Sequence, residues 1–334
     1  MKAMILAAGA GTRLFPLTLN LPKPMAPIAN QPLMDRIVKL LHAQGFDSLI
    51  ANLHSQPHVI IDYFQDNCPS GVSIEFRCEK ELLGTAGGVR NCKDFFDDTF
   101  AVISGDALTD VDLTFLLNEH KKNGALCTLA LKTLENCEKY GVAVTDERGR
   151  ITAFQEKPEK SEAVSNRVNT GIYIFEPEIF TCIPVGYFDF GSQLFPELVR
   201  GGAPIYAVEI ADYWCDVGDK AVYMQAHQDL AYGRIALDDN FGVLESYENG
   251  GRAILGKNIA VADNVQWHGF ASVGANSRLG PGATIKNTII WDNCIIGKGV
   301  SISNAIITSG CRIEAYSRVT GTVYTGVGAV QFCP

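Results

Sequence analysis

The sequence predicts two regions of different architecture, an α/β domain over residues 1–232 and a parallel β-helix over residues 253–334, joined by a linker at 233–252. In the first region, short apolar runs alternate with segments of helical periodicity, which is typical of a Rossmann-like, doubly wound, mainly parallel sheet. The first of these runs ends in a loop of very small residues. In the second region, apolar residues recur every six positions, which indicates a β-helix.

Composition supports a folded chain and narrows the class of ligand. The 334 residues suffice for two domains, and 47% hydrophobic with 19% charged residues can build a large core. The net charge of −9 argues against a general nucleic-acid binder, which would present a basic face. It permits a small anionic ligand, because a few local cations outweigh a distant average charge.

The sequence also bears on location and redox state. It contains no apolar run of about 18 residues, and the first strand follows Met1 and Lys2 directly, so we expect a cytoplasmic protein without a membrane span or signal peptide. The ten cysteines form no CxxC pair. We therefore expect reduced thiols and neither disulfides nor a zinc site.

The stretch from Lys2 to Pro24 holds the first candidate site. Residues 4–6 are an apolar strand, and residues 7–11 (AAGAG) carry almost no side chains. Such a loop lets a ligand approach the main chain and leaves backbone N–H groups free for anionic oxygens. Thr12 and Arg13 follow at once, and Lys23 stands between two prolines. A small loop, a hydroxyl and two cations together predict a polyphosphate site.

The wider pattern around this loop indicates a family. The chain has neither the GxxxxGK of a Walker loop nor the third glycine of the dinucleotide fingerprint, where Leu14 stands. The longer G-x-G-T-R-L-x-P-L-T, followed by P-K-P, resembles the signature of the sugar-1-phosphate nucleotidylyltransferases, the NDP-sugar pyrophosphorylases. The resemblance implies the nucleotidyltransferase fold. It also implies that the following residues bind the nucleotide: Leu6, Ala7, Ala8, Gly9, Gly11, Thr12 and Arg13.

The α/β region continues as alternating elements up to a last helix over residues 223–232. Ligands in such sheets bind beyond the carboxyl ends of the strands, where the Gly9 loop lies. His54 and His58 are four residues apart, but Pro57 between them argues against a helical metal pair. The expected strands cover residues 48–53, 72–78, 100–104, 125–131, 141–144, 151–154 and 169–175, and the expected helices cover 31–44, 58–64 and 113–117.

A second small-residue loop follows Glu79. By the resemblance it folds over the nucleotide base and contributes Gly84 and Thr85. Family members that use uridine or thymidine nucleotides commonly have glutamine where this chain has Glu79. An ionised carboxylate only accepts hydrogen bonds. Guanine offers adjacent N–H donors, whereas uracil and thymine offer one N–H between carbonyls, so Glu79 favours guanine. Glu79 as a solvated strand-end charge, and Glu81 as the reader, remain open alternatives.

The candidate metal ligands are two aspartates. Asp106 lies just beyond the strong strand 100–104, a good position for holding Mg²⁺ among ligand phosphates, although Gly-Asp is also common in turns. The resemblance assigns the metal role to Asp106 and, through the W-C-D-V-G segment, to Asp216. Asp110 and Asp112 are expected to cap the following helix.

Three short motifs resemble the family's sugar-phosphate site. They are Y-G-V with Gly141, E-K-P with Glu156 and Lys157, and N-T-G with Asn169 and Thr170. A glutamate can accept from sugar hydroxyls, and the adjacent lysine can neutralise the phosphate. E-K-P alone is a common surface turn, and Asn169 could be a plain turn residue. The Asp-Phe pair at 189–190 has no assigned role.

The six-residue period near the end predicts about four coils of a left-handed parallel β-helix, at three six-residue units per turn. Two steps in the series are five residues long. The apolar positions are Leu255, Val261, Trp267, Val273, Leu279, Ile285, Ile290, Ile296, Ile302, Ile307, Ile313 and Val319.

The role of the β-helix is predicted from its ends. An acyltransferase site would need a histidine base, and His268 is the only histidine there, so this role is disfavoured. Open ends of a solenoid must be capped or paired. We therefore expect a homo-oligomer, a dimer or tetramer, assembled through the β-helix, with the apolar tail at residues 330–334 as part of the contact.

The motif order is most similar to that of the bacterial mannose-1-phosphate guanylyltransferases. The resemblance implies that GTP and mannose 1-phosphate give GDP-mannose and pyrophosphate, with Mg²⁺ as cofactor and Arg13 and Lys23 as catalytic residues. One alternative is UTP with glucose 1-phosphate, giving UDP-glucose. Another is a catalytically dead regulatory or scaffold subunit, but such proteins tend to lose the cations or metal ligands, which are all present here.

Overall fold

The computed structural model describes residues 1–236, 242–326 and 328–331 and contains two compact units. The first, which we call the sheet unit, comprises Met1–Ala10 and Arg36–Asp216. The second, the coil unit, comprises Gly11–Asp35 and Val217–Pro334. The division differs from the boundaries expected from sequence because helix α6 (Lys220–Ala231) packs on the strands of the coils.

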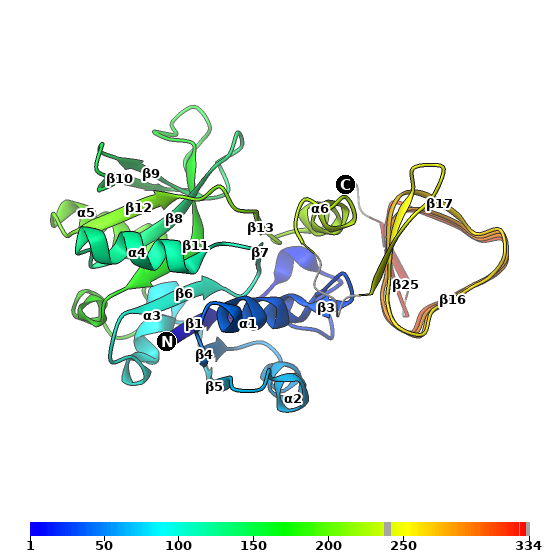
Figure 1. Cartoon of the computed structure of the whole chain (residues 1–334), viewed down its shortest axis with the longest axis horizontal. Helices are drawn as coiled ribbons and strands as arrows, with labels where there is room; N and C mark the ends of the chain where they lie inside the picture. The colour runs from blue at the N-terminus through cyan, green and yellow to red at the C-terminus, as the bar shows by residue number, and fades with distance from the viewer. Residues whose placement is uncertain (237–241, 327, 332–334) are drawn as a thin grey trace. The chain divides into compact units, whose positions relative to one another are not determined.

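Every residue of the sheet unit is described, and a nine-stranded sheet dominates it (Figure 1). The strand order is β10-β9-β11-β6-β1-β4-β5, and β8 pairs with both β11 and β12. The strands are β1 (Lys2–Leu6), β4 (Ser48–Leu53), β5 (Ser73–Cys78), β6 (Phe100–Ser104), β8 (Cys127–Thr133), β9 (Gly141–Thr145), β10 (Ile151–Glu156), β11 (Arg167–Phe175) and β12 (Ile205–Glu209). A separate small pair joins β7 (Ala107–Thr109) to β13 (Trp214–Asp216).

The sheet is mixed, so the prediction of a mainly parallel sheet is correct only for β5, β4, β1 and β6 and for the pair of β12 with β8. Strands β5, β4, β1 and β6 run parallel, with Met4 opposite both Ile50 and Val102. These three side chains are fully buried, as expected for parallel strands covered on both faces. The direction changes where β11 returns antiparallel beside β6, with Ile172 opposite Ile103. Strand β11 is also antiparallel to β8 and β9.

The helices of the α/β part include the three expected from sequence, but the helix predicted over residues 113–117 continues to Asn123. They are α1 (Leu33–Ala43), α2 (Pro57–Asn67), α3 (Gly84–Asn91), α4 (Leu113–Asn123) and α5 (Phe195–Arg200). Helix α1 starts after the prediction because β3 (Gln31–Pro32) pairs with β2 (Pro27–Ile28). Asp112 caps α4 by accepting from the Phe115 amide at 2.8 Å, as predicted. Asp110 instead accepts from the Tyr213 amide at 2.7 Å, so it joins β7 to β13.

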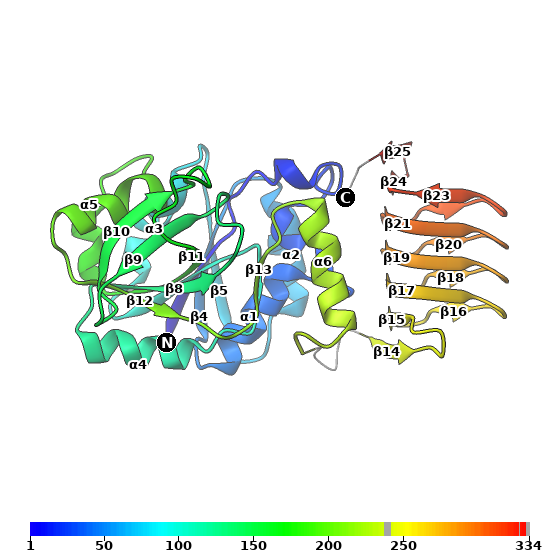
Figure 2. The ribbon, with the colours of Figure 1, turned by 90° about the horizontal axis from the view of Figure 1, so that it is seen from above.

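The coil unit stacks parallel strands, coil upon coil (Figure 2). Viewed along their axis, the coils superpose on a three-cornered outline (Figure 1). The register aligns Leu255, Val273, Ile290 and Ile307 in one ladder, which explains the two five-residue steps, since one coil is a residue longer than the next two. The strands are β15 (Arg252–Leu255), β16 (Ala260–Val261), β17 (Gln266–Val273), β18 (Arg278–Leu279), β19 (Thr284–Ile290), β20 (Ile295–Ile296), β21 (Ser301–Ile307), β22 (Arg312–Ile313), β23 (Arg318–Thr320) and β24 (Thr322–Thr325).

The predicted apolar positions fill the interior of the coils. All of them are buried except Val261, which is 41% exposed. Val261 lies in β16, the edge strand of the four-stranded ladder β16-β18-β20-β22, so among the described residues a strand covers it on one side only. At the corners the chain repeatedly takes a positive φ, which asparagine and glycine tolerate best. One corner column holds Asn258, Asn276 and Asn293, whose side-chain amides bond one another at 3.3 and 3.4 Å.

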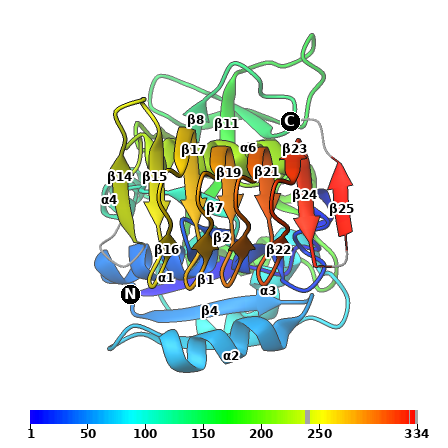
Figure 3. The same ribbon diagram turned by 90° about the vertical axis from the view of Figure 1, so that its right-hand side faces the viewer.

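Both ends of the longer ladder carry an antiparallel strand (Figure 3). Strand β14 (Val243–Ser246) pairs with β15, and β25 (Gly328–Gln331) pairs with β24. The expected linker at 233–252 therefore contains a strand of the ladder, because β14 bonds the first coil. Residues 332–334 of the predicted apolar tail lie outside the described residues, and the expected oligomer stays a prediction.

Helix α6 is tied to the coils by aromatic and polar contacts. The Trp291 indole donates to the Tyr223 hydroxyl at 3.0 Å, and this hydroxyl donates to the Pro27 carbonyl at 2.5 Å. Arg252 lies over the Tyr232 ring at 5.1 Å and donates to the Ala231 carbonyl at 3.2 Å.

In the part of the chain that the structure describes, no helix is long and apolar enough to cross a membrane. The nine cysteines in that part are free thiols.

Candidate active site

The carboxyl ends of β1 and β6 meet at one edge of the sheet. The Gly105 amide donates to the Leu6 carbonyl at 2.8 Å, and a Cβ atom on Gly105 would lie 2.8 Å from that same oxygen. Only glycine therefore fits there. This contact places Asp106, which follows Gly105, beside the predicted nucleotide loop where it begins at Ala7. The short parallel strands thus bring two of the predicted motifs to the same edge.

Of the two predicted metal ligands, Asp216 is the last residue of β13, and Asp106 directly precedes β7, the partner of β13. Strand β13 runs antiparallel to β7 and places Asp216 opposite Ala107, the neighbour of Asp106. The sequence alone could not pair two aspartates so far apart. Asp106 Oδ1 accepts from the Ser104 hydroxyl at 2.5 Å, which orients this carboxylate.

This donor set suits a hard cation. Among the described residues, no group of three or more His, Cys, Asp or Glu side chains could hold a metal. Asp106 and Asp216 lie on adjoining segments, and Mg²⁺ usually takes only one or two protein carboxylates and keeps several waters. The residues present therefore fit the ion predicted from sequence.

Glu79 lies in a buried polar chain that also includes Asn52. The Asn52 side chain accepts from the Ala7 amide at 3.0 Å and donates to Glu79 Oε1 at 2.7 Å. Glu79 Oε2 accepts from the Leu83 amide at 3.1 Å. Asn52 is 2% and Glu79 7% exposed. The chain thus links the end of β1 to the second loop, and sequence reasoning missed Asn52, although a lone amide inside the apolar run LIANL was a usable signal.

Gly84 and Thr85 begin helix α3 and contact the segment before η5 (Phe190–Leu194). The Thr85 hydroxyl donates to Asp189 Oδ2 at 2.9 Å and accepts from the Phe190 amide at 2.7 Å. A Cβ atom on Gly84, where φ is +73°, would lie 2.6 Å from the Phe188 carbonyl oxygen. The Asp-Phe pair that the sequence left without a role therefore holds the predicted base loop.

Gly141 and Glu156 are direct partners in the pairing of β9 with β10. A Cβ atom would lie 2.7 Å from Glu156 Oε2 if placed on Gly141, and 2.1 Å if placed on Gly191. The carboxylate therefore occupies a slot that two glycines leave open. Burial raises the pKa of Glu156, while Lys157, whose Nζ lies 3.3 Å from Oε1, lowers it. The E-K-P motif is thus a partly buried acid beside an exposed cation.

Asn169 and Thr170 lie at an irregular point of β11, where the register with β8 shifts. The Asn169 amide donates to the Tyr173 hydroxyl at 2.9 Å. Thr170 donates through its hydroxyl to the Ala130 carbonyl and accepts the Trp214 indole N–H through its own carbonyl, both at 2.8 Å. Gly171 lies against Ser104, so this segment reaches the edge that carries Asp106.

The two predicted cationic residues, Arg13 and Lys23, belong to the coil unit, and each packs against a glycine. At Gly11, φ is +63° and a Cβ atom would lie 2.9 Å from the Cβ of Lys23, so the buried lysine stem packs on bare backbone. A Cβ atom on Gly218 would lie 3.2 Å from the Arg13 guanidinium nitrogens. Gly218 stands two residues after Asp216 in the sequence. That Arg13 and Lys23 act on the same ligand as the two aspartates stays a prediction.

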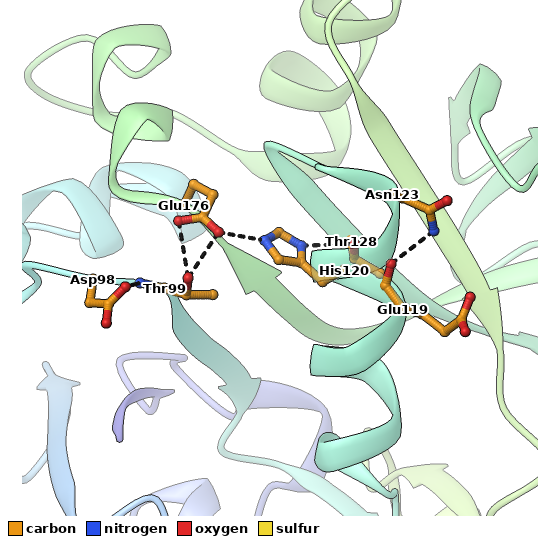
Figure 4. A network of polar contacts seen from close by, with 7 residues as sticks. All are labelled: Asp98, Thr99, Glu119, His120, Asn123, Thr128 and Glu176. Carbon is orange, nitrogen blue, oxygen red and sulfur yellow. Dashed lines mark hydrogen bonds and ion pairs between the residues drawn. The ribbon is translucent and has the colours of Figure 1, made fainter.

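A second buried polar network lies at the opposite edge of the sheet (Figure 4). His120 Nδ1 is 2.9 Å from the Thr128 hydroxyl, and Nε2 is 3.1 Å from Glu176 Oε1. Glu176 also accepts from the Thr99 hydroxyl at 2.8 Å. Because Thr99 precedes β6 and Glu176 follows β11, this network is at the far end of both strands from Asp106. Burial lowers the pKa of His120, although Glu176 opposes this shift.

The fold defines an α/β protein in which the predicted nucleotide loop begins beside Asp106, at the carboxyl ends of the parallel strands β1 and β6. Comparison with known proteins makes the class specific: the chain belongs to the nucleotidyl transferase family, whose model matches residues 2–233. The resemblance to sugar-1-phosphate nucleotidylyltransferases that the N-terminal motif predicted is confirmed.

Two curated relatives and one solved structure define the comparison further. The chain is 38% identical to a UTP–glucose-1-phosphate uridylyltransferase of Synechocystis sp., over 87% of this chain and 83% of the relative. It is 33% identical to a mannose-1-phosphate guanylyltransferase of Mycobacterium tuberculosis, over 87% and 79%. The structure of HddC from Yersinia pseudotuberculosis complexed with GMP-PN is similar with a TM-score of 0.59 and 25% identity, covering 68% of this chain and 98% of HddC.

Proposed function

We propose that the chain transfers a guanylyl group from GTP to mannose 1-phosphate, giving GDP-mannose and pyrophosphate. The coarser activity, sugar-1-phosphate nucleotidyltransfer, is that of the curated relatives. The observation that carries the proposal is the register of β7 and β13, which sets Asp216 opposite the neighbour of Asp106 beside the end of β1. Two carboxylates at that point suit a reaction between two phosphate compounds.

The proposed chemistry is a direct displacement. An oxygen of the sugar phosphate attacks the nucleotide α-phosphorus in line, and pyrophosphate leaves with no covalent enzyme intermediate. Both reactants are anions, so catalysis rests on charge neutralisation and positioning. In this proposal Arg13 holds the β- and γ-phosphates, and Lys23 neutralises charge at the α-phosphate. Asp106 and Asp216 hold a divalent cation, Mg²⁺, and the bound ion supplies further neutralisation of phosphate charge.

The choice of GTP rests on Glu79. Its two oxygens each accept one hydrogen bond from the protein, from Asn52 and from the Leu83 amide. Each carboxylate oxygen has two lone pairs, so each retains capacity for one N–H of a guanine edge. The mannose assignment follows the guanylyltransferase relatives and the motif order.

UTP with glucose 1-phosphate is the second candidate. Glu79 is already held by Asn52 and Leu83, an arrangement that also fits a residue which shapes the loop and does not read the base. The 38% identical relative named as a uridylyltransferase supports this candidate. A non-catalytic subunit is the third possibility, and the presence of Arg13, Lys23 and both aspartates argues against it.

For the coils we propose a left-handed winding and a role in homo-oligomerisation as a dimer or tetramer. The parallel ladders and the 17- to 18-residue spacing of partners support a β-helix. Sedimentation of the full chain tests the oligomer, and a monomer at micromolar concentration would contradict it.

The deciding experiment is pyrophosphate release with Mg²⁺ across four NTPs, each paired with mannose 1-phosphate and glucose 1-phosphate. Turnover confined to GTP with mannose 1-phosphate is expected. A Glu79→Gln variant should then lose its preference for GTP, because an amide offers guanine a donor where an acceptor is needed, while the exposed Glu81→Gln keeps the preference. Turnover with UTP and glucose 1-phosphate would establish the second candidate. No turnover and no exchange of labelled pyrophosphate into any NTP would indicate the non-catalytic subunit.

A further inference from the structure

Residues 186–191, which we call the bridge segment, connect two parts of the candidate site. At one end the segment pairs with the start of α3 through backbone bonds. The Phe188 amide donates to the Leu83 carbonyl, and the Phe188 carbonyl accepts from the Gly87 amide, both at 2.9 Å. These two bonds fix the bridge segment directly onto the loop that is predicted to cover the nucleotide base.

Glycines in the loop make this approach possible. A Cβ atom on Gly84 would lie 2.6 Å from the Phe188 carbonyl oxygen. A Cβ atom on Gly87 would lie 2.4 Å from the Gly186 carbonyl oxygen. Both distances are too short for a side chain. The G-T-A-G pattern is therefore needed to admit the bridge segment, whatever else it does for a ligand.

Asp189 adds a charged contact to the same junction. Its Oδ2 accepts from the Thr85 hydroxyl at 2.9 Å, and its Oδ1 accepts from the amide and hydroxyl of Ser192 at 3.0 Å. The Thr85 hydroxyl in turn accepts from the Phe190 amide at 2.7 Å. Hydrogen bonds to an ionised acceptor are stronger than neutral ones. Asp189 therefore holds Thr85 and the first turn of η5 at the same time.

The other end of the bridge segment borders Glu156. Gly191 leaves the space that the Glu156 carboxylate occupies, since a Cβ atom there would lie 2.1 Å from Oε2. Phe190 is buried and packs on the rings of Tyr173 and Phe195, at centroid distances of 5.0 and 5.4 Å. This packing restrains Gly191 relative to β11. A shift of the segment at Asp189 would therefore change the slot for Glu156.

We infer that Asp189 is a positioning residue that couples the base loop to the Glu156 carboxylate, so that the two substrate sites are set by one segment. The inference rests on the proposed function only in assigning Thr85 to the nucleotide site and Glu156 to the sugar-phosphate site. In this inference Thr85 acts by hydrogen bonding to Asp189 and not by contacting the nucleotide.

The kinetic test removes the Thr85 hydroxyl without changing its shape. Thr85→Val should raise KM for both the NTP and the sugar phosphate by about tenfold, the scale of one charge-assisted bond. Thr85→Ser restores the hydroxyl and should remain within about twofold of wild type. Ser192→Ala is the matched control, because it removes a different bond to Asp189 that does not reach α3. A Thr85→Val variant with a changed KM for NTP only would overturn the inference.

A double-mutant cycle and hydrogen exchange provide readouts of the coupling itself. Thr85→Val combined with Glu156→Gln should be non-additive in KM for the sugar phosphate, whereas independent sites would add. Without substrates, Thr85→Val should speed amide exchange at Gly87 and Phe188, and also at Lys157, whose amide bonds the Tyr140 carbonyl at 3.0 Å. Unchanged exchange at Lys157 would overturn the inference even if the enzyme is active. If the wild-type protein turns over no substrate pair, the proposed function is refuted. The amide-exchange result then decides by itself whether the two segments are coupled.

Discussion

Contacts recur from turn to turn in the ladder of coils, whereas each contact at the edge of the sheet occurs only once. In the coils, the same contact recurs in each turn, so Ile285 and Ile302 are equivalent neighbours in one ladder and both are fully buried. At the sheet edge no contact recurs. Gly105 admits the Leu6 carbonyl, and Gly191 admits the Glu156 carboxylate, each for a different reason.

The difference shows where the molecule has redundancy and where it has none. Stability in the coils is close to a sum over repeated, similar layers. The sheet edge depends on single residues brought together from distant parts of the chain, such as Asp106 and Asp216. Substitutions should therefore affect activity at the edge and stability in the coils, and the following tests can separate the two.

The largest effect is expected for charged residues of the candidate site. Asp106→Ala and Arg13→Ala should each reduce kcat by about 10²–10³-fold or more, because one electrostatic contact to the transition state is lost. The melting temperature should stay close to wild type. Asp97→Ala is the control, since its exposed carboxylate pairs only with Lys2, at 2.7 Å, in the described contacts. Wild-type turnover in either site variant would remove that residue from the mechanism.

In the ladder of coils, a substitution should lower the stability and leave the turnover unchanged. Ile302→Ala removes a fully buried side chain from a central coil and should lower the free energy of unfolding by about 2–5 kcal/mol. The folded variant should retain its turnover at low temperature. Ile295→Ala is the matched control, because Ile295 is 42% exposed in the neighbouring strand β20. Denaturant titration followed by tryptophan fluorescence measures the effect, in a Trp214→Phe background that leaves Trp267 and Trp291 of the coils as the emitting residues. Equal losses from the two substitutions would contradict the layered interior.

The same contrast explains how much could be predicted from sequence. The ladder was predictable because one apolar position in six is a local pattern, and only Val261, at the unprotected edge, differs from it. The motif residues at strand ends were predictable because small residues and aspartates directly follow apolar runs. The antiparallel part of the sheet was not, since nothing local in β11 specifies that it returns beside β6.

The contacts between distant residues were also beyond the sequence. A buried hydrogen bond joins Asn52 of β4 to Glu79, the residue after β5, and Thr85 reaches Asp189 across 104 positions. Such pairs carry no periodicity. Their only sequence signal is a polar residue inside an apolar run or beside a glycine, which marks a candidate without naming its partner.

A third test uses His120, a buried titratable residue of the sheet unit. The folded-state pKa of His120 lies below its ordinary value of 6.5 because burial disfavours the cation, with Lys121 acting in the same direction and Glu176 opposing both. Below about pH 6.5 the unfolded chain therefore binds a proton that the folded chain does not, and the free energy of unfolding should fall as the pH drops. The contribution is fully present above pH 6.5.

His120→Gln provides the comparison. It should cost about 1–3 kcal/mol at pH 8, because buried partners lose their bonds, but it should flatten the pH dependence between pH 5 and 7. Melting curves of the two proteins across that range measure the difference. Parallel curves would show that another group causes the loss of stability in acid.

The smallest expected effect arises in the coils. There, lowering the pH should raise the free energy of unfolding, whereas through His120 it lowers this free energy. Burial raises the pKa of Asp292, although its Oδ1 accepts from the Ala275 amide at 2.7 Å. Between the ordinary value of 3.8 and this raised pKa, the folded chain binds the additional proton, so acidification stabilises the coils through this residue. Asp292→Asn keeps the acceptor for Ala275 and removes the charge. Because solvent screens the charge of this exposed residue, the variant should raise the free energy of unfolding only slightly at pH 7, and by progressively less as the pH falls. A loss of stability at pH 7 would show that the charge of Asp292 contributes more to the corner than its desolvation costs.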